Sequence, residues 1–283
     1  MNPALQKLTS MITPTINTTD VYTGQNMHPN AFRIYGGQVL AQIIRAAADT
    51  VGTDRVLHSQ HAYFLRPGDP KLAITFEVDR ARDGGTFSSR RVTALQRGKP
   101  ILVSTLSFQV PCDGDQHQPT MPPVVGPENL INERDIALAN NNLHQDFMIT
   151  SGLDVDMRCI EPIDWDNPTP REPKMQIWIR VNGEVEDDLS LHQALLAYMS
   201  DSFLIDIALI THGYTYKNAN MQIASLDHTL WFHQDFKANE WILHEVIGKR
   251  TGGGRGLSEG RFYSRDGRLI ATTMQECLMR SKD

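Results

Sequence analysis

Residues His192 to Ile210 read HQALLAYMSDSFLIDIALI, a nearly unbroken apolar run with one aspartate, Asp201, at its middle. A helix that is apolar on every side is normally buried in the protein core. An ionised carboxylate is costly there unless it is paired, hydrogen-bonded or beside a polar cavity. The run therefore predicts a buried central helix with a site built around Asp201. Asp206 points elsewhere on the same helix, and we expect it to meet solvent or an interface.

Two polar residues downstream are candidate partners for Asp201. Ser225 lies in the strand-like stretch MQIASLDHTLWFH, and Gln275 lies in the strand-like stretch RLIATTMQECLMR. In the last stretch, one face is predicted to carry alternate residues, namely Ala271, Thr273, Gln275, Cys277 and Met279. An acid, a hydroxyl and an amide brought together from one helix and two strands indicate a site that holds and activates water.

The bulk composition is that of a globular protein. The chain has 283 residues, enough for one large domain or two ordinary ones, and its net charge of -6 argues against nucleic-acid binding. Three cysteines without a close pair predict a reducing, cytoplasmic setting, and ten histidines without ligand spacing predict no metal site. The polar interruptions at Asp201 and Ser202 argue against a membrane span.

The sequence repeats one plan twice. A helix predicted at Gly36 to Thr50 precedes four strand-like segments, and the helix around Asp201 precedes four more. The turn signals Arg97-Gly98 and Asp266-Gly267 occupy matching places before the last strand of each half. A helix followed by antiparallel strands must bury its apolar surface against them. We therefore expect an α+β chain with an N-terminal unit at 1–111, a linker with a helical or irregular segment at 112–152, and a C-terminal unit at 153–283.

These segments resemble one family in their residues and in their order, over nearly the whole chain. The matching stretches include YGGQVLAQ (35–42), HAYFLRPGD (61–69), DDLSLHQALLAYMSD (187–201) and IASLDHTLWFH (223–233). The chain is similar to the acyl-CoA thioesterase II family, whose fold is the double hotdog, two antiparallel sheets each wrapped around a central helix. That resemblance implies hydrolysis of fatty acyl-CoA to free fatty acid and CoA without a cofactor, and a homo-oligomer.

The resemblance also implies the catalytic group. The family's acid, hydroxyl and amide fall on Asp201, Ser225 and Gln275, with serine where several relatives have threonine. A thioester carbonyl is already electrophilic, so water deprotonated by Asp201 and held by the other two side chains needs no covalent intermediate. The alternative hypothesis is a non-catalytic acyl-CoA-binding module on the same fold.

Three further residues are candidates for substrate binding. His58 and His61 are predicted on opposite faces of one strand, where a core or interface role is the more common outcome for a histidine. Arg255 follows the glycine run 252–254, whose backbone N–H groups could approach CoA phosphates; a flexible hairpin explains the run equally well.

Three competing patterns are rejected. Gly256 to Gly260 fits the G-x-S-x-G nucleophile elbow, but a strand-like stretch follows it and no histidine occurs after His244. Ser225 and His228, three apart on one strand, are predicted to face opposite ways and so to form no nucleophile–base pair. The stretch 164–168, DWDNP, resembles a hotdog hydratase element, but its aspartate spacing differs and it lacks the histidine, so a turn is the better account.

Overall fold

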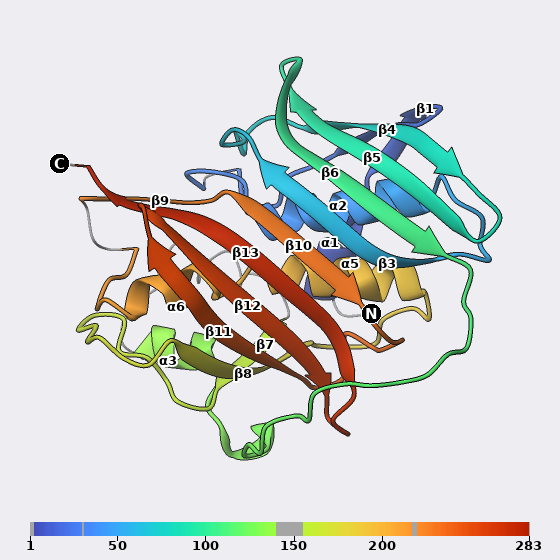
Figure 1. The fold of residues 1–283 in the computed structure, drawn as a ribbon. Helices are drawn as coiled ribbons and strands as arrows, with labels where there is room; N and C mark the ends of the chain where they lie inside the picture. The colour runs from blue at the N-terminus through green and yellow to red at the C-terminus, as the bar shows by residue number, and fades with distance from the viewer. Residues whose placement is uncertain (1–2, 30, 140–154, 217–219, 283) are drawn as a thin grey trace.

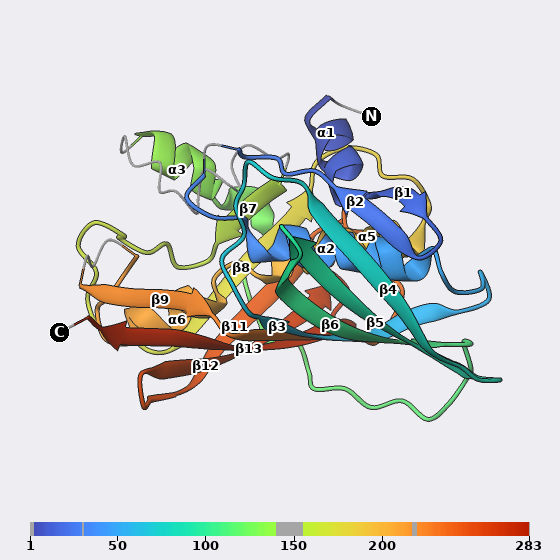
Figure 2. The ribbon, with the colours of Figure 1, turned by 90° about the horizontal axis from the view of Figure 1, so that it is seen from above.

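The computed structural model describes residues 3–29, 31–139, 155–216 and 220–282. Within these ranges the strands form one antiparallel sheet of 13 strands that curves around two adjacent central helices (Figure 1, Figure 2). The predicted α+β arrangement, with antiparallel strands wrapped around a central helix in each half, is confirmed.

The N-terminal half opens with a helix and a hairpin that the sequence pattern did not reveal. Its central helix then precedes four long strands, as predicted. The elements are α1 (Pro3–Ile12), β1 (Thr15–Thr18), β2 (Val21–Gly24), α2 (Gly36–Ala48), β3 (Val56–Phe64), β4 (Ile74–Asp83), β5 (Phe87–Gln96) and β6 (Lys99–Gln109).

The C-terminal half repeats the order, with two strands ahead of its central helix. That helix is divided in two, and the strand after it is also divided. The elements are β7 (Val155–Cys159), β8 (Lys174–Val181), α5 (Leu189–Ser200), α6 (Leu204–Ile210), β9 (Met221–Ser225), β10 (Asp227–Phe232), β11 (Ile242–Gly252), β12 (Arg255–Ser264) and β13 (Leu269–Ser281).

The two halves meet edge to edge. The strand order is β1-β2-β4-β5-β6-β3-β10-β13-β12-β11-β8-β7, with β9 pairing β13, so β3 of the N-terminal half and β10 of the C-terminal half pair at the centre. His61 lies opposite Thr229 in that antiparallel pair. The two predicted sheets are thus joined into one.

The two central helices pack against each other in opposite directions. The first turn of α2 lies at the last turn of α5, since the Gly37 N–H donates to Asp201 Oδ2. At the other end, Arg45 forms an ion pair with Asp188, which caps the start of α5. Two helix ends, one from each half, therefore meet at each end of the pair.

Alternation and turn signals read from the sequence are borne out. Ile74, Phe76 and Val78 alternate with Thr75, Glu77 and Asp79 in the sequence, which predicts one buried face, and these three are buried in β4. Arg97 and Gly98 both have positive φ, as a tight hairpin turn between β5 and β6 requires. Gly267 also has positive φ, and its N–H bonds the Ser264 carbonyl to close the turn before β13.

The connection between the halves lies over the outside of the C-terminal strands. The Trp178 indole on β8 donates to the Val125 carbonyl. A short 3-10 turn, η1 (Pro127–Asn129), and α3 (Glu133–Ala139) follow, with α3 beside β7. The remainder of the segment predicted as linker, from residue 140 on, lies outside the described residues.

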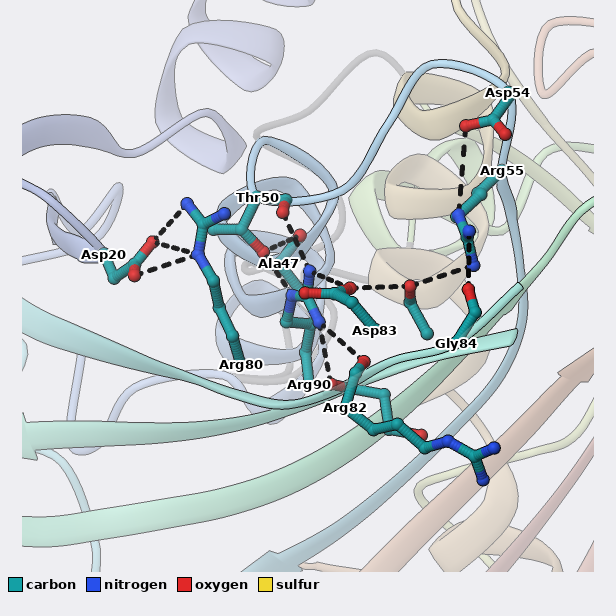
Figure 3. Close-up of polar contacts among 12 residues, drawn as sticks. Asp20, Ala47, Thr50, Asp54, Arg55, Arg80, Arg82, Asp83, Gly84 and Arg90 are labelled. Carbon is teal, nitrogen blue, oxygen red and sulfur yellow. Dashed lines mark hydrogen bonds and ion pairs between the residues drawn. The ribbon is translucent and has the colours of Figure 1, made fainter. Parts of the chain in front are cut away.

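A buried arginine ties the end of α2 to the β4–β5 hairpin (Figure 3). Arg90 is 1 % exposed, and its guanidinium donates to the side chain and carbonyl of Thr50 and to the Asp83 carboxylate at 2.7 Å. Hydrogen bonds from Ser88 and Arg90 lower the pKa of Asp83. Arg90 is therefore part of the core, whereas its neighbour Arg91 is 65 % exposed and pairs with Asp79.

The contrast between Arg90 and Arg91 makes a prediction about stability. Arg90→Met should lower the free energy of unfolding by about 2–4 kcal/mol, because it leaves several buried acceptors without their donors. Arg91→Met should change it by less than about 0.5 kcal/mol, since the pair with Asp79 is at the surface. Urea unfolding of both variants measures the difference; equal effects would contradict a structural role for Arg90.

Candidate active site

A cavity of about 480 Å³ opens where the start of α2 meets the end of α5. Its wall also includes the segment after β3 and the residues of β9. Most of the lining side chains are apolar, and the charged ones are Arg33, Arg66, Asp201 and Asp206. The cavity therefore combines an apolar wall with a few charged groups, as ligand sites generally do.

Asp201 reaches this cavity because the apolar helix breaks there. The sequence predicted one continuous helix; instead α5 ends at Ser200, Asp201 is its C-cap residue, and α6 starts at Leu204. Phe203, between them, has φ 69°, a left-handed conformation that is rare for a bulky residue and occurs mainly at functional or strained positions. The break turns the Asp201 carboxylate out of the helix packing and into the cavity wall.

The start of α2 binds that carboxylate. Gly37 N–H donates to Asp201 Oδ2 at 2.9 Å, and the positive end of a helix favours a negative charge at this place. A Cβ on Gly36 would lie 2.7 Å from the same oxygen, and a Cβ on Gly37 would collide with the Tyr198 carbonyl. The two glycines of YGGQVLAQ are therefore needed for the close approach of the two helices.

Tyr35 reinforces the same contact. Its hydroxyl lies 2.9 Å from the Tyr198 carbonyl, to which it donates, and 3.0 Å from the Ser202 hydroxyl. The rings of Tyr35 and Tyr198 meet edge to face at 5.1 Å. Burial, and then the nearby Asp201 charge, raise the pKa of Tyr198, so its hydroxyl stays neutral beside Asp201.

Ser225 lies at the same cavity, and Gln275 forms a hydrogen bond with Ser225. Ser225, at the end of β9, lines the cavity together with Asp201. Gln275, on the buried face of β13, donates from Nε2 to Ser225 Oγ at 3.1 Å but is not itself among the lining residues. The expected alternation of β13 is confirmed, because the face that carries Gln275 is buried from Ala271 to Met279.

The expected alternation between Ser225 and His228 is wrong. The strand predicted to hold both is interrupted at Leu226, which separates β9 from β10 although both pair with β13. As a result both side chains turn toward Gln275: His228 Nδ1 lies 2.6 Å from Gln275 Oε1. His228 bonds the amide rather than the serine, so the conclusion that the two form no nucleophile–base pair stands.

The three substrate-binding candidates lie away from the cavity wall. A bulge at His58 turns the side chains of His58 and His61 to the same face of β3. Burial, and then the nearby His61, lower the pKa of His58. His58 bonds the Ser107 hydroxyl, and His61 packs on the Trp231 ring, so opposite faces were wrongly predicted. Arg255 sits beside the β11–β12 turn in an exposed ion pair with Glu276.

Several cavity residues were missed or misplaced by the sequence. Asp206, expected at solvent or an interface, lines the cavity. Arg33 and Arg66 were not singled out; each donates to a backbone carbonyl, of Ile223 and Pro100, and keeps further N–H donors. Phe203, at the helix break, also lines the cavity.

The G-x-S-x-G stretch forms no nucleophile elbow, and residues 164–168 form a turn, as predicted. Ser258 of the G-x-S-x-G pattern lies in the middle of β12, opposite Gln275, with no helix after it. A Cβ on Gly256 would meet Ala208 of α6 at 2.6 Å, and one on Gly260 would meet His244 at 2.6 Å, so packing explains both glycines. Asp164 accepts from the N–H groups of Asp166 and Asn167, which is a turn.

Two further properties concern metal-ligating side chains and the apolar helix. In the part of the chain that the structure describes, no group of three or more His, Cys, Asp or Glu side chains could hold a metal ion. One helical run, Leu189–Ile210, is long and apolar enough to cross a membrane. However, 83 % of its 18-residue apolar stretch is buried inside the protein. Such burial is typical of a core helix in a globular protein.

Comparison with known proteins covers both halves. Residues 169–278 match the family model described as acyl-CoA thioesterase, and residues 23–109 match the acyl-CoA thioesterase N-terminal domain. The chain is 38 % identical to acyl-CoA thioesterase 2 of Haemophilus influenzae, over 92 % of each chain. It is also 38 % identical to acyl-coenzyme A thioesterase 8 of rat, over 93 % of this chain and 85 % of that one.

Solved structures of thioesterase and hot dog proteins are similar to this one. An acyl-CoA thioesterase II from Mycobacterium marinum superposes with a TM-score of 0.80 at 34 % identity, covering 97 % of this chain and 98 % of the other. A protein from Alicyclobacillus acidocaldarius described as having a hot dog fold superposes with a TM-score of 0.78 at 19 % identity, covering 97 % and 98 %. The second likeness supports the fold alone.

The contact between Gly37 and α5 makes a second prediction. Gly37→Ala should lower the free energy of unfolding by about 1–3 kcal/mol, because overpacking against the Tyr198 carbonyl outweighs the helix propensity gained by alanine. Gly85→Ala is the matched control, since nothing lies within 4 Å of its added Cβ. Chemical unfolding of both variants measures the effect, and a Gly37→Ala protein as stable as the Gly85→Ala protein would contradict the close approach.

Proposed function

The chain belongs to the acyl-CoA thioesterase II family, and we propose that Asp201 and Ser225 activate the water with which it cleaves its substrate. The protein is an acyl-CoA thioester hydrolase that releases free fatty acid and CoA. The observation that carries the proposal is the placement of an acid and a hydroxyl in one apolar cavity, with the acid fixed by the start of α2.

The proposed reaction needs only water and side chains. Asp201 takes a proton from water as the oxygen attacks the thioester carbonyl carbon, and the carbonyl becomes a tetrahedral oxyanion. Collapse of the oxyanion breaks the C–S bond, and the CoA sulfur leaves with the proton that Asp201 had accepted. Ser225 holds the water beside Asp201, and Gln275 holds Ser225.

The apolar wall suits the acyl part of the substrate. Val39, Phe64 and Phe203 line the cavity around the two polar groups. Removing water from around an acyl chain supplies binding free energy in proportion to the apolar area covered. The same apolar surroundings strengthen the electrostatic effect of Asp201 on the one water that remains.

The non-catalytic alternative is less well supported. A module that only binds acyl-CoA has no need of a carboxylate and a hydroxyl at the same cavity, and the matched relatives are named as thioesterases. Such a module would bind acyl-CoA stoichiometrically and release no CoA thiol.

Cytoplasmic location and a homo-oligomeric state also stay proposals. All three cysteines, Cys112, Cys159 and Cys277, are free thiols, which supports a reducing compartment. Tyr63 and Phe87 are large apolar side chains left exposed, which supports an interface with a second copy.

The decisive variants change the two cavity acids separately. Asp201→Asn should lower kcat for a fatty acyl-CoA by about 10²–10⁴-fold, because the amide cannot accept the proton from water. Asp206→Asn is the matched control and should keep a rate near that of the unmodified protein, since the proposed proton transfer does not use Asp206. A thiol-release assay measures both.

Ser225→Thr should remain active, because it keeps the hydroxyl, whereas Ser225→Ala should be impaired. The proposal is wrong if Asp201→Asn is as active as the unmodified protein or if Asp206→Asn is the variant that loses activity.

A further inference from the structure

His228 is a buried titratable group that the proposed reaction does not use. It is fully buried at the start of β10, and burial lowers its pKa to about 4. The imidazole is therefore neutral near pH 7, with one nitrogen as a donor and the other as an acceptor. Its two nitrogens face different elements, so the tautomer decides what each neighbour can do.

The partner at Nδ1 fixes that tautomer. Gln275 Oε1 lies 2.6 Å from Nδ1, and an amide oxygen can only accept, so Nδ1 carries the proton. Nε2 is then the acceptor. Ser200 Oγ lies 2.9 Å from Nε2 and also donates to the Ala197 carbonyl at 2.9 Å, while Thr273 Oγ1 lies 3.2 Å from Nε2 and donates to the Thr229 carbonyl at 2.6 Å.

The hydrogen bonds then run in one direction toward the cavity. His228, which contacts Ser200 through Nε2, donates from Nδ1 to Gln275, and the Gln275 amide N–H donates to Ser225 Oγ. Because that bond occupies a lone pair of Ser225, the serine keeps its own hydrogen to donate. Ser225 lines the cavity, so this donor is directed to what the cavity holds.

We propose that His228 is a positioning residue that makes the Ser225 hydroxyl a donor in the cavity and links it to the helix end that carries Asp201. The link to the helix runs through Ser200, the residue before Asp201. A water that accepts from Ser225 keeps its own hydrogen for Asp201, which is the orientation that proton transfer requires. The inference rests on the proposed function of Asp201 and Ser225.

The opposite tautomer would reverse every bond. With the proton on Nε2, the bare Nδ1 would face the Gln275 amide nitrogen, and the amide oxygen would face Ser225. Ser225 would then donate to Gln275 and could only accept from the cavity. The position of one proton on His228 therefore tests the proposal directly.

The first experiment is a two-bond ¹H–¹⁵N correlation spectrum of the full-length protein labelled with ¹⁵N-histidine, near pH 7. The His228 signals are assigned by their loss in His228→Asn. We expect a protonated Nδ1 and an unprotonated Nε2. A protonated Nε2, or an imidazolium, would overturn the proposal without reference to activity.

The second experiment measures kcat and KM for a fatty acyl-CoA. His228→Leu should lower kcat by about 10–100-fold with KM little changed, as loss of a residue that orients a reacting group does. His228→Asn keeps a donor near the position of Nδ1 and should recover part of the rate. His244→Leu is the matched control: His244 is equally buried, stacks on Phe262 and has no hydrogen-bond partner among the described residues.

A double variant separates this inference from the proposed function. If His228 acts through Ser225, then His228→Leu should add little to the loss caused by Ser225→Ala. A folded His228→Leu protein with unchanged kcat, or fully additive losses, would overturn the role of His228 while Asp201→Asn stays inactive. If Ser225→Ala and Asp201→Asn are themselves active, the proposed function fails instead. Should His228→Leu not fold, the spectrum of the unmodified protein decides.

Discussion

The hydrogen bond from the Gly37 N–H to the Asp201 carboxylate is the contact on which the candidate site depends. It joins the first turn of one central helix to the C-cap residue of the other, and so joins the two halves of the chain. Two glycines allow that approach, and a break in the apolar helix supplies the carboxylate. The same contact satisfies an N–H at the helix start and places an acid beside an apolar cavity.

The two ends of the helix pair are built from equivalent parts but are not alike. Asp49 is the C-cap residue of α2, as Asp201 is of α5. The Asp49 carboxylate is held by the Tyr22 hydroxyl at 2.7 Å, and the start of α5 is capped by the Asp188 side chain and paired with Arg45. The start of α2 has no side-chain cap, so its N–H groups can bind Asp201. Duplication of one plan has thus left an acid at both ends, but an uncapped helix start only where Asp201 lies.

Much of this was predictable from the sequence, for identifiable reasons. Period-two alternation in β4 and β13, and the turns at Arg97-Gly98 and Asp266-Gly267, follow from local side-chain and backbone preferences. The position of Asp201 inside an apolar run of the sequence was enough to mark it. What could not be predicted depends on irregularities of one residue: the helix break at Phe203, the interruption at Leu226 and the bulge at His58. Each shifts the faces of the residues after it, which is why His228 was wrongly placed on the face opposite Ser225 and Asp206 was wrongly placed outside the cavity.

The central claim is that Asp201 activates water and forms no bond to the acyl group, and oxygen labelling in a single turnover tests it most directly. With enzyme in excess over a fatty acyl-CoA in H₂¹⁸O, water attack on the thioester predicts one ¹⁸O in the released acid, no ¹⁸O in the peptide that contains Asp201, and no acyl adduct in the quenched protein. An ¹⁸O-labelled Asp201, or an acyl group on Asp201 or Ser225, would contradict the account.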